Sequence, residues 1–327
     1  MSIEVIKAGL LSTVVAGERN GFRYLGIGPG GAMDSFAMRM SNYLVGNESD
    51  AAALEMNFPT PELFILEDQL ISLTGQGFRI YINNNIFPSW RPILVKKDAI
   101  IKFEKVDTGS RIYLTVHGGW KAQQWLGSST SHLISSIGGY SGRALQKGDI
   151  LEANILLQGV DEIKALSWGI SKKELDNVYL PASEIRIVQS VETDLLSPES
   201  KEKLLTSQLK ISSQSNRMGF RLEGEKLFLS KPIELVSSPV DFGTIQLLPD
   251  GNLIILMADH QTTGGYPRIG SVIKSDLSKL AQLSANDKIS FKLISLSEAE
   301  NEILKRNKLL DELQSACLTQ YKKYFKV

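Results

Sequence analysis

Short apolar runs separated by turns make up most of the region between residues 50 and 150. Each run has the length and the content of β-branched and aromatic residues that favour a strand, and helical periodicity is largely missing. One sequence pattern recurs at residues 95–100, 145–150 and 283–289: an apolar residue, a turn with Asp, and then a strand. This pattern is typical of antiparallel β-barrels. The predicted strands cover residues 52–56, 63–66, 70–74, 79–82, 99–103 and 112–116.

The chain before residue 50 predicts strands and one helix. Residues 3–15 indicate two short strands, and residues 22–27 indicate a third. Asp34 is a typical N-cap residue, so a helix is expected from about residue 35 to residue 45. Gly46 is placed to end this helix, because glycine adopts the left-handed backbone conformation that follows many helices.

The second half predicts another β-rich unit and a terminal helix. Its first strand is expected at residues 184–188, and Ser197 before a proline opens a short helix. A long helix is expected over residues 297–324, where Ser297 and Glu300 form a capping box. An apolar stripe along this helix indicates packing. The stripe consists of Ile303, Leu310, Leu313, Cys317 and Tyr324.

A polar stretch with helical character between residues 157 and 181 separates the two β-rich regions. We therefore predict a mainly β protein with a few helices, organised as two antiparallel β-barrel domains and a long C-terminal helix. The predicted limits are 1–178 for the N-terminal barrel, 182–294 for the C-terminal barrel and 295–327 for the helix.

The densest polar chemistry follows an apolar run at residues 253–257, which predicts a buried strand. A turn requires Gly and Pro, but it does not require the charged, amide, hydroxyl and aromatic groups that crowd into residues 258–267. We therefore expect a functional site there, with Asp259 and His260 as candidate catalytic residues. The candidate substrate-binding residues in and beside this segment are Gln246, Thr262, Thr263, Gly264, Gly265 and Tyr266.

Two arginines, Arg217 and Arg221, flank a glycine four residues apart. In a strand this even spacing places both side chains on one face, where two guanidinium groups favour a carboxylate or a phosphate. A solvated or ion-paired face is the alternative. Arg217 is a candidate catalytic residue and Arg221 a candidate substrate-binding residue. Asp34, at the predicted helix start, is another candidate substrate-binding residue.

Charge and cysteine content narrow the class of partner. The chain has 36 acidic and 36 basic residues among 327, so no electrostatic footprint for nucleic acid or an acidic membrane surface is expected. Cys317 is the only cysteine, which excludes an internal disulfide and a cysteine-based metal cluster. No metal site is predicted. We expect a cytoplasmic protein, because no apolar stretch approaches the length of a membrane span.

Three other motif matches have simpler explanations. Residues 26–31 match G-x-G-x-x-G, but Pro29 removes one amide donor and no parallel βαβ series follows. Residues 37–40 resemble a biotin attachment sequence, but Arg39 stands where the lysine would be, and guanidinium stays protonated. The chain is therefore expected to carry no covalent biotin. Ser141 misses the spacing of a nucleophile elbow by one residue.

Six motifs occur in a common order at residues 28–34, 42–47, 52–55, 73–75, 215–222 and 259–267. With these motifs the chain resembles the family of the 5-oxoprolinase C subunit. The family is also known as allophanate hydrolase subunit 2, as the antagonist of a sporulation-kinase inhibitor (KipA), and as the carboxyltransferase domain of urea carboxylase. The resemblance implies two related β-barrel domains of cyclophilin-like type.

The resemblance also implies partners and an activity. The 5-oxoprolinase B subunit, which is KipI-like, and the A subunit are expected to act with this chain. Together they would convert 5-oxoproline to glutamate at the expense of ATP, which is shared with the partner. Arg217 and Arg221 would hold the substrate carboxylate or phosphate, and Asp259 or His260 would move protons. The amides of residues 264–265 would stabilise developing negative charge.

Two alternatives to this hypothesis stay open. The chain could be a carboxyltransferase module that acts on urea or a related amide, with biotin supplied by another polypeptide. It could also be a non-catalytic regulator that binds a kinase-inhibitor homologue. The neighbouring genes and an assay of ADP release with 5-oxoproline distinguish the three functions.

Overall fold

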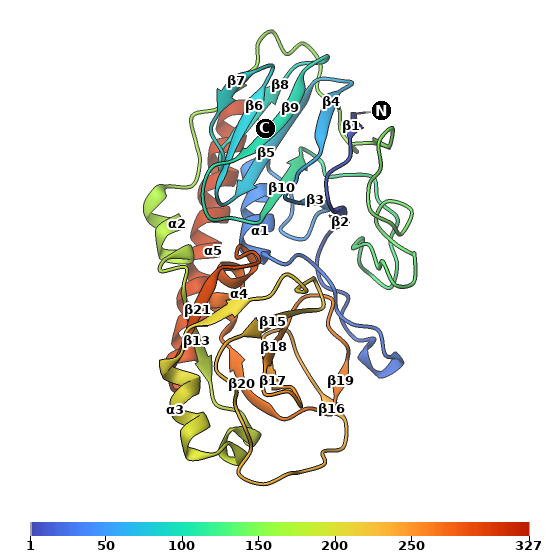
Figure 1. Cartoon of the computed structure of the whole chain (residues 1–327). Helices are drawn as coiled ribbons and strands as arrows, with labels where there is room; N and C mark the ends of the chain where they lie inside the picture. Colours follow the sequence, from blue (N-terminus) through green and yellow to red (C-terminus); the bar gives the residue numbers. More distant parts are fainter. Residues whose placement is uncertain (1, 327) are drawn as a thin grey trace. The chain divides into compact units, whose positions relative to one another are not determined.

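The computed structural model describes residues 2–326 and is mainly β (Figure 1). The chain divides into two compact units, and neither is one continuous stretch of sequence. The first unit comprises the residues up to 19, residues 34–172 and the residues from 309 onward; the second comprises residues 20–33 and 173–308. The domain limits expected from the sequence stay a prediction. The α-helices are α1 (Ser35–Leu44), α2 (Lys172–Tyr179), α3 (Pro198–Thr206), α4 (Lys274–Ala281) and α5 (Leu296–Phe325).

The first unit contains two six-stranded sheets whose paired strands are antiparallel. One sheet has the order β11 (Ile150–Leu151), β1 (Ile3–Lys7), β4 (Glu62–Ile65), β9 (Ile100–Lys105), β6 (Phe78–Ile82) and β7 (Asn85–Phe87). The other has the order β12 (Lys164–Ala165), β8 (Pro92–Val95), β5 (Gln69–Gly75), β10 (Arg111–Val116), β3 (Ala53–Asn57) and β2 (Ser12–Val15).

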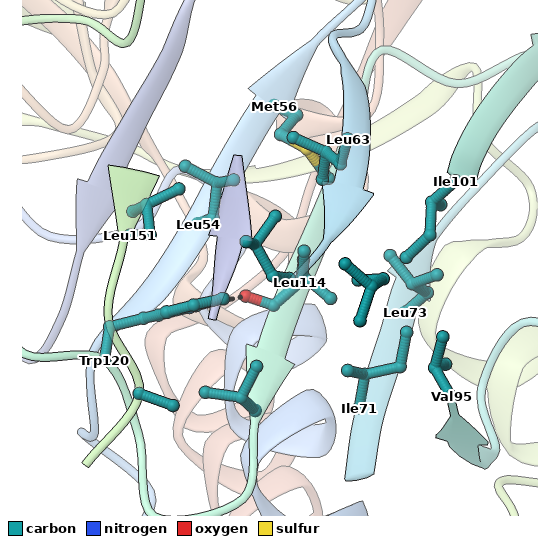
Figure 2. Close-up of a cluster of buried hydrophobic side chains, with 14 of the residues drawn as sticks. Leu54, Met56, Leu63, Ile71, Leu73, Val95, Ile101, Leu114, Trp120 and Leu151 are labelled. Carbon is teal, nitrogen blue, oxygen red and sulfur yellow. Dashed lines mark hydrogen bonds between the residues drawn. The ribbon is translucent and has the colours of Figure 1, made fainter. Parts of the chain in front are cut away.

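The core of the first unit combines apolar side chains from both sheets. Figure 2 shows Leu54 and Leu114 of one sheet together with Leu63 and Ile101 of the other. Trp120 belongs to this cluster, and its indole N–H donates a hydrogen bond to the Leu114 carbonyl at 3.3 Å. The indole is 3 % exposed, so this bond satisfies a donor that water does not reach.

Helix α1 is bound to the second sheet of this unit by polar side chains. Asp34 caps the helix by accepting a hydrogen bond from the Ala37 amide at 3.0 Å, which confirms the predicted N-cap. Thr74 of β5 donates to the Ala37 carbonyl, and Thr115 of β10 donates to the Ser41 carbonyl. The same strands turn their alternate, apolar residues to the core, as the two-residue period of a strand requires.

The second unit contains the one closed barrel among residues 2–326. The first unit has two sheets, so of the two predicted barrels only the second is shown as a closed barrel. Its order is β13 (Glu184–Val188), β20 (Arg268–Val272), β17 (Thr244–Leu247), β18 (Leu253–Leu256), β15 (Gly219–Glu223), β14 (Leu209–Ile211) and β21 (Lys288–Leu293). The pair β13–β21 is parallel, and the other pairs are antiparallel. A short two-stranded sheet joins β16 (Ser238–Pro239) to β19 (Thr263–Gly264).

Helix α5 begins close to the predicted start, but its capping box is formed by other residues. Ser295 accepts a hydrogen bond from the Glu298 amide at 3.2 Å, and Glu298 accepts one from the Ser295 amide at 2.8 Å. The predicted box of Ser297 and Glu300 is therefore wrong by two residues. Both sites match the S-x-x-E pattern, so the pattern alone does not select between them.

Most predicted strands are confirmed within one or two residues, including the six between residues 50 and 120 and the strand at residues 253–257. The strand expected at residues 22–27 is wrong, because this stretch contains a 3-10 turn, η1 (Arg23–Leu25). Strands β7 and β8 were not predicted. A second 3-10 turn, η2 (Val191–Leu195), precedes α3.

Residues 2–326 provide neither a membrane-spanning helix nor a metal cluster. None of the helices in this range combines the length and the apolar character that crossing a bilayer requires. The same residues contain no group of three or more His, Cys, Asp or Glu side chains that could hold a metal ion.

Candidate functional site

A row of side chains crosses the outer face of the barrel in the second unit. Arg221 of β15 pairs with Ile254 of β18, and Ile254 pairs with Gln246 of β17. Directly paired residues of antiparallel strands project to the same face. Their sequence neighbours, such as Phe220 and Ile245, are buried in the barrel core. Arg221, Ile254 and Gln246 therefore lie side by side on the outside.

The 257–267 loop, which follows β18, crosses this outer face before the chain returns as β20. Its Thr263 pairs with Pro239 through the short sheet β16–β19. Gln246 is 1 % exposed although it faces outward, because this loop covers it. A Cβ atom at Gly264 would lie 2.5 Å from the Gln246 Nε2 atom. Glycine at this position thus lets the loop approach the Gln246 side chain closely.

Arg217 and Asp259 fix the start of the loop. The Arg217 guanidinium donates from Nε to Asp259 Oδ2 at 2.7 Å and from Nη2 to Asp259 Oδ1 at 3.0 Å. The same Nη2 donates to the Gly31 carbonyl at 2.7 Å, and the Asp259 amide donates to the Arg217 carbonyl at 2.8 Å. The Arg217 side chain is 7 % exposed. The Nε and Nη2 donors of Arg217, which could otherwise bind a ligand carboxylate, are therefore occupied by Asp259.

His260 is buried beside this ion pair. Its Nδ1 atom lies 2.5 Å from the Gln261 carbonyl oxygen, which can only accept a hydrogen bond, so Nδ1 carries the proton of the neutral ring. The Nε2 atom is buried and has no hydrogen-bond partner among residues 2–326. Burial lowers the pKa of the imidazole from its ordinary 6.5; the Gln261 carbonyl opposes this, and Arg23 adds to it. His260 is therefore a neutral base with a free lone pair at Nε2.

The 20–33 segment completes the surroundings of His260, which the sequence did not predict. A Cβ atom at Gly28 would lie 2.8 Å from the His260 carbonyl oxygen. Arg23 donates to Asp241 at 3.1 Å and also to the Val240 carbonyl. Because residues 20–33 precede the barrel by more than a hundred residues, no local pattern signals that they pack on it.

Three of the candidate substrate-binding residues, Arg221, Gln246 and Tyr266, line a pocket beside the 257–267 loop, here called the polar pocket. It has a volume of about 280 Å³, and its other lining residues are Leu248, Pro249, Asp250, Ile254, Leu256 and Gln261. Arg221 is exposed, and the structure gives its guanidinium no hydrogen-bond or ion-pair partner among the described residues. Gln261 was not predicted, although it stands next to His260.

An apolar groove adjoins the polar pocket. It has a volume of about 620 Å³ and shares Leu248, Pro249 and Tyr266 with the polar pocket. Gly265 also lines the groove. Its other lining residues are Leu227, Phe228, Leu229, Pro232, Ile233, Glu234, Leu235, Leu247 and Pro267.

The remaining candidates lie outside both cavities. Thr262 is half-buried, and its carbonyl accepts a hydrogen bond from the Val240 amide at 3.2 Å. Thr263 is exposed and pairs in the short sheet. Asp34 belongs to the first unit, where it is fully buried as the N-cap of α1. Arg217 and Asp259 form an ion pair, and His260, the residue after Asp259, has its Nδ1 on the Gln261 carbonyl, whereas Arg221 lines the polar pocket.

Comparison with known proteins identifies relatives over most of the chain. The family model described as "Carboxyltransferase domain, subdomain A and B" matches residues 25–293. The chain is 35 % identical to a protein of Haemophilus influenzae named as the C subunit of 5-oxoprolinase, over 95 % of its own length and 97 % of that protein. It is 36 % identical to the protein of the same name from Escherichia coli, covering 91 % of this chain and 93 % of that protein.

A solved structure extends the comparison to a larger protein. The chain superimposes on the crystal structure of the K. lactis urea amidolyase with a TM-score of 0.87 at 27 % identity. The match covers 95 % of this chain but only 20 % of the urea amidolyase chain. From the matched residues 25–293 and the nearly full-length relatives, we conclude that the chain belongs to the carboxyltransferase domain family, subdomains A and B, which includes proteins named as 5-oxoprolinase C subunits.

Proposed function

We propose that this chain is a subunit of an ATP-dependent 5-oxoprolinase that converts 5-oxoproline to glutamate together with an A subunit and a KipI-like B subunit. The single observation that carries the proposal is the identity of 35 % and 36 %, over nearly the whole length of both proteins, to proteins named as 5-oxoprolinase C subunits. The proposal includes a cytoplasmic location and the cyclophilin-like character of two barrel domains.

The polar pocket suits a small lactam acid. The substrate carboxylate would bind the Arg221 guanidinium, since the protein supplies it with no competing carboxylate partner among residues 2–326. The ring amide would face the side chains of Gln246 and Gln261, and the ring would lie against Tyr266. Gln246 Nε2 makes only a long hydrogen bond of 3.4 Å to the Tyr266 carbonyl, so its amide could bind the substrate once the covering loop moves.

Arg217 would position the loop rather than hold the substrate, because Asp259 already engages two of its donors. His260 would carry the proton. As water adds to the lactam carbonyl, one proton passes to His260 Nε2 and is then delivered to the ring nitrogen while the C–N bond breaks. The amides of Gly264 and Gly265 would stabilise the negative charge on the carbonyl oxygen. His260 Nε2 is buried in this chain, so a substrate could reach it only if association with a partner subunit moved the 257–267 loop.

A nucleotide site in this chain is not part of the proposal. The first turn of α1 follows the glycine-rich residues 26–31, but Asp34 places its own carboxylate on the Ala37 amide that a phosphate would require. ATP supplies the driving force for opening a stable amide, and we assign its binding to the partner subunits. Thr262, Thr263 and Asp34 are retained as candidate substrate-binding residues without a defined contact.

Carboxyl transfer to urea or a related amide is the second candidate function. The observation in its favour is the TM-score of 0.87 with urea amidolyase, of which this chain spans about a fifth. Biotin would then come from another polypeptide, since Arg39 cannot be biotinylated. The regulatory alternative has no observation of its own in the structure.

The test is to purify the chain with the products of its neighbouring genes and to measure ADP and glutamate. The proposal expects 5-oxoproline to stimulate ADP release with matching formation of glutamate. Turnover of urea with carboxylated biotin, in a complex that does not form glutamate from 5-oxoproline, would replace the proposal with the second function. Binding of an inhibitor-like protein without turnover of either substrate would indicate the regulator.

A further inference from the structure

The two cavities beside the 257–267 loop adjoin each other. Leu248, Pro249 and Tyr266 line both of them, and only the polar pocket has a basic residue in its lining. One end is the polar pocket of about 280 Å³, and the other is the apolar groove of about 620 Å³. The groove alone lies within the range of about 300–1,000 Å³ that is typical of small-molecule sites.

The lining of the polar end contains one basic and one acidic residue, Arg221 and Asp250. The Arg221 guanidinium has no ion-pair partner among residues 2–326, whereas the exposed carboxylate of Asp250 has partners of its own. Asp250 accepts hydrogen bonds from the Asn252 amide at 3.0 Å and from the Asn252 side chain at 2.6 Å, and Lys226 lies 4.0 Å away. An anionic group of a ligand is therefore favoured at Arg221.

The apolar groove at the other end exposes large hydrophobic side chains to water. Phe228 is 58 % exposed, Ile233 46 % and Tyr266 46 %. The groove lining contains one acidic residue, Glu234, and no basic residue. The groove is lined by Leu247 of β17, and β17 lies two inter-strand spacings of about 4.8 Å each from β15, which carries Arg221. A ligand that used both ends would therefore be longer than a single small ring.

We propose that this site binds an amphipathic monocarboxylate, with its carboxylate at Arg221 and its hydrocarbon part in the apolar groove. The chemistry expected is a medium-length acyl chain or an arylalkyl acid rather than a compact lactam acid alone. The proposal does not depend on the proposed function, since it concerns binding to this chain by itself. The Arg221 guanidinium, which has no ion-pair partner among residues 2–326, and the three lining residues shared with the adjoining groove are the observations that carry it.

Isothermal titration of the full chain with butanoate, hexanoate and octanoate tests the proposal, with octan-1-ol as the uncharged probe. Affinity should rise by up to about fourfold for each added methylene, because each one leaves water for the groove. Octanoate should bind at least tenfold more tightly than octan-1-ol. Equal binding of all three carboxylates would show that the groove is not used, and equal binding of octanoate and octanol would show that Arg221 is not used; either result overturns the proposal.

Matched variants separate the two ends. Arg221→Ala should weaken octanoate about tenfold and leave octan-1-ol unchanged, whereas Arg39→Ala, at an exposed arginine of the first unit, should change neither. Ile233→Asp should weaken both eight-carbon probes, and Ile86→Asp, at an exposed isoleucine of β7, should weaken neither. Circular dichroism of each variant verifies folding. Unchanged octanoate affinity in folded Arg221→Ala and Ile233→Asp would overturn this proposal. The proposed function is tested separately, by glutamate formation from 5-oxoproline in the assembled complex.

Discussion

Arg217 and Asp259 form a two-pronged ion pair, at 2.7 and 3.0 Å, that joins the residue before β15 to the loop after β18. These two strands are neighbours in the barrel, so the pair fixes the point at which the loop leaves it. The Arg217 guanidinium also reaches the Gly31 carbonyl of the 20–33 segment. One side chain thus connects three chain segments around His260.

Removing one member of this pair should be costly, because it leaves the other charge buried without its partner. Arg217→Ala is expected to lower the free energy of unfolding by about 3 kcal/mol. The double variant Arg217→Ala/Asp259→Ala should lose less than the sum of the two single variants, as in a double-mutant cycle. Urea denaturation of the four proteins measures this coupling. Strictly additive losses would mean that the two side chains do not interact in solution.

The lowered pKa of His260 predicts how stability depends on pH. The folded ring releases its proton below 6.5, whereas the unfolded ring titrates near that ordinary value. As pH falls below about 6.5, the unfolded state takes up a proton that the folded state does not, so stability decreases. Above 6.5 both states are neutral and the contribution is flat. His260→Gln should reduce this loss in denaturation curves measured from pH 7.5 to pH 5, and an identical pH profile in the variant would exclude the assignment.

Gly28 should be intolerant of even a small side chain. A Cβ atom there would lie 2.8 Å from the His260 carbonyl oxygen, a backbone atom that cannot turn aside. Gly28→Ala is expected to destabilise the protein by about 1–3 kcal/mol. The control is Gly265→Ala, whose Cβ would meet nothing closer than 3.4 Å. Thermal unfolding of both variants provides the comparison, and similar melting temperatures would argue against close packing of residues 20–33 on the His260 loop.

Two serines at the start of α5 give a matched pair for the capping box. Ser295→Ala removes the acceptor of the Glu298 amide and should lower stability by about 1 kcal/mol. Ser297→Ala, two residues later, should have an effect close to zero, since Ser297 lies within the helix. Chemical denaturation compares the two variants. A larger loss at Ser297 would support the capping position expected from sequence.

The contrast between these serines shows where sequence patterns reach their limit. The pattern S-x-x-E occurs at both positions, so the pattern alone does not decide which serine is the cap. Residues 22–27 were predicted as a strand from their apolar content, but they form a 3-10 turn within a segment held by Arg217 and Arg23. By contrast, Asp34 determines a local structure through its own side chain, and its prediction as an N-cap was confirmed.

The candidate site shows the same division between local and distant effects. The loop after β18 was chosen as the candidate site because its polar residues are adjacent in sequence. The different environments of Arg217 and Arg221 were not predicted, because they depend on Asp259, which lies 42 residues from Arg217. Arg221 lies within β15 and faces outward, whereas Arg217 precedes the strand and turns to the ion pair. The roles of Asp34, Thr262 and Thr263 in binding stay predictions.

The most direct test of the central claim is the steady-state kinetics of 5-oxoproline-dependent glutamate formation by the assembled complex with chain variants. Arg221→Ala should raise KM for 5-oxoproline at least tenfold with a smaller change in kcat, because it removes a contact to the substrate carboxylate. His260→Gln should lower kcat at least about a hundredfold. The exposed-arginine variant Arg39→Ala should match the unmodified complex. Wild-type kcat and KM in both Arg221→Ala and His260→Gln would contradict the account.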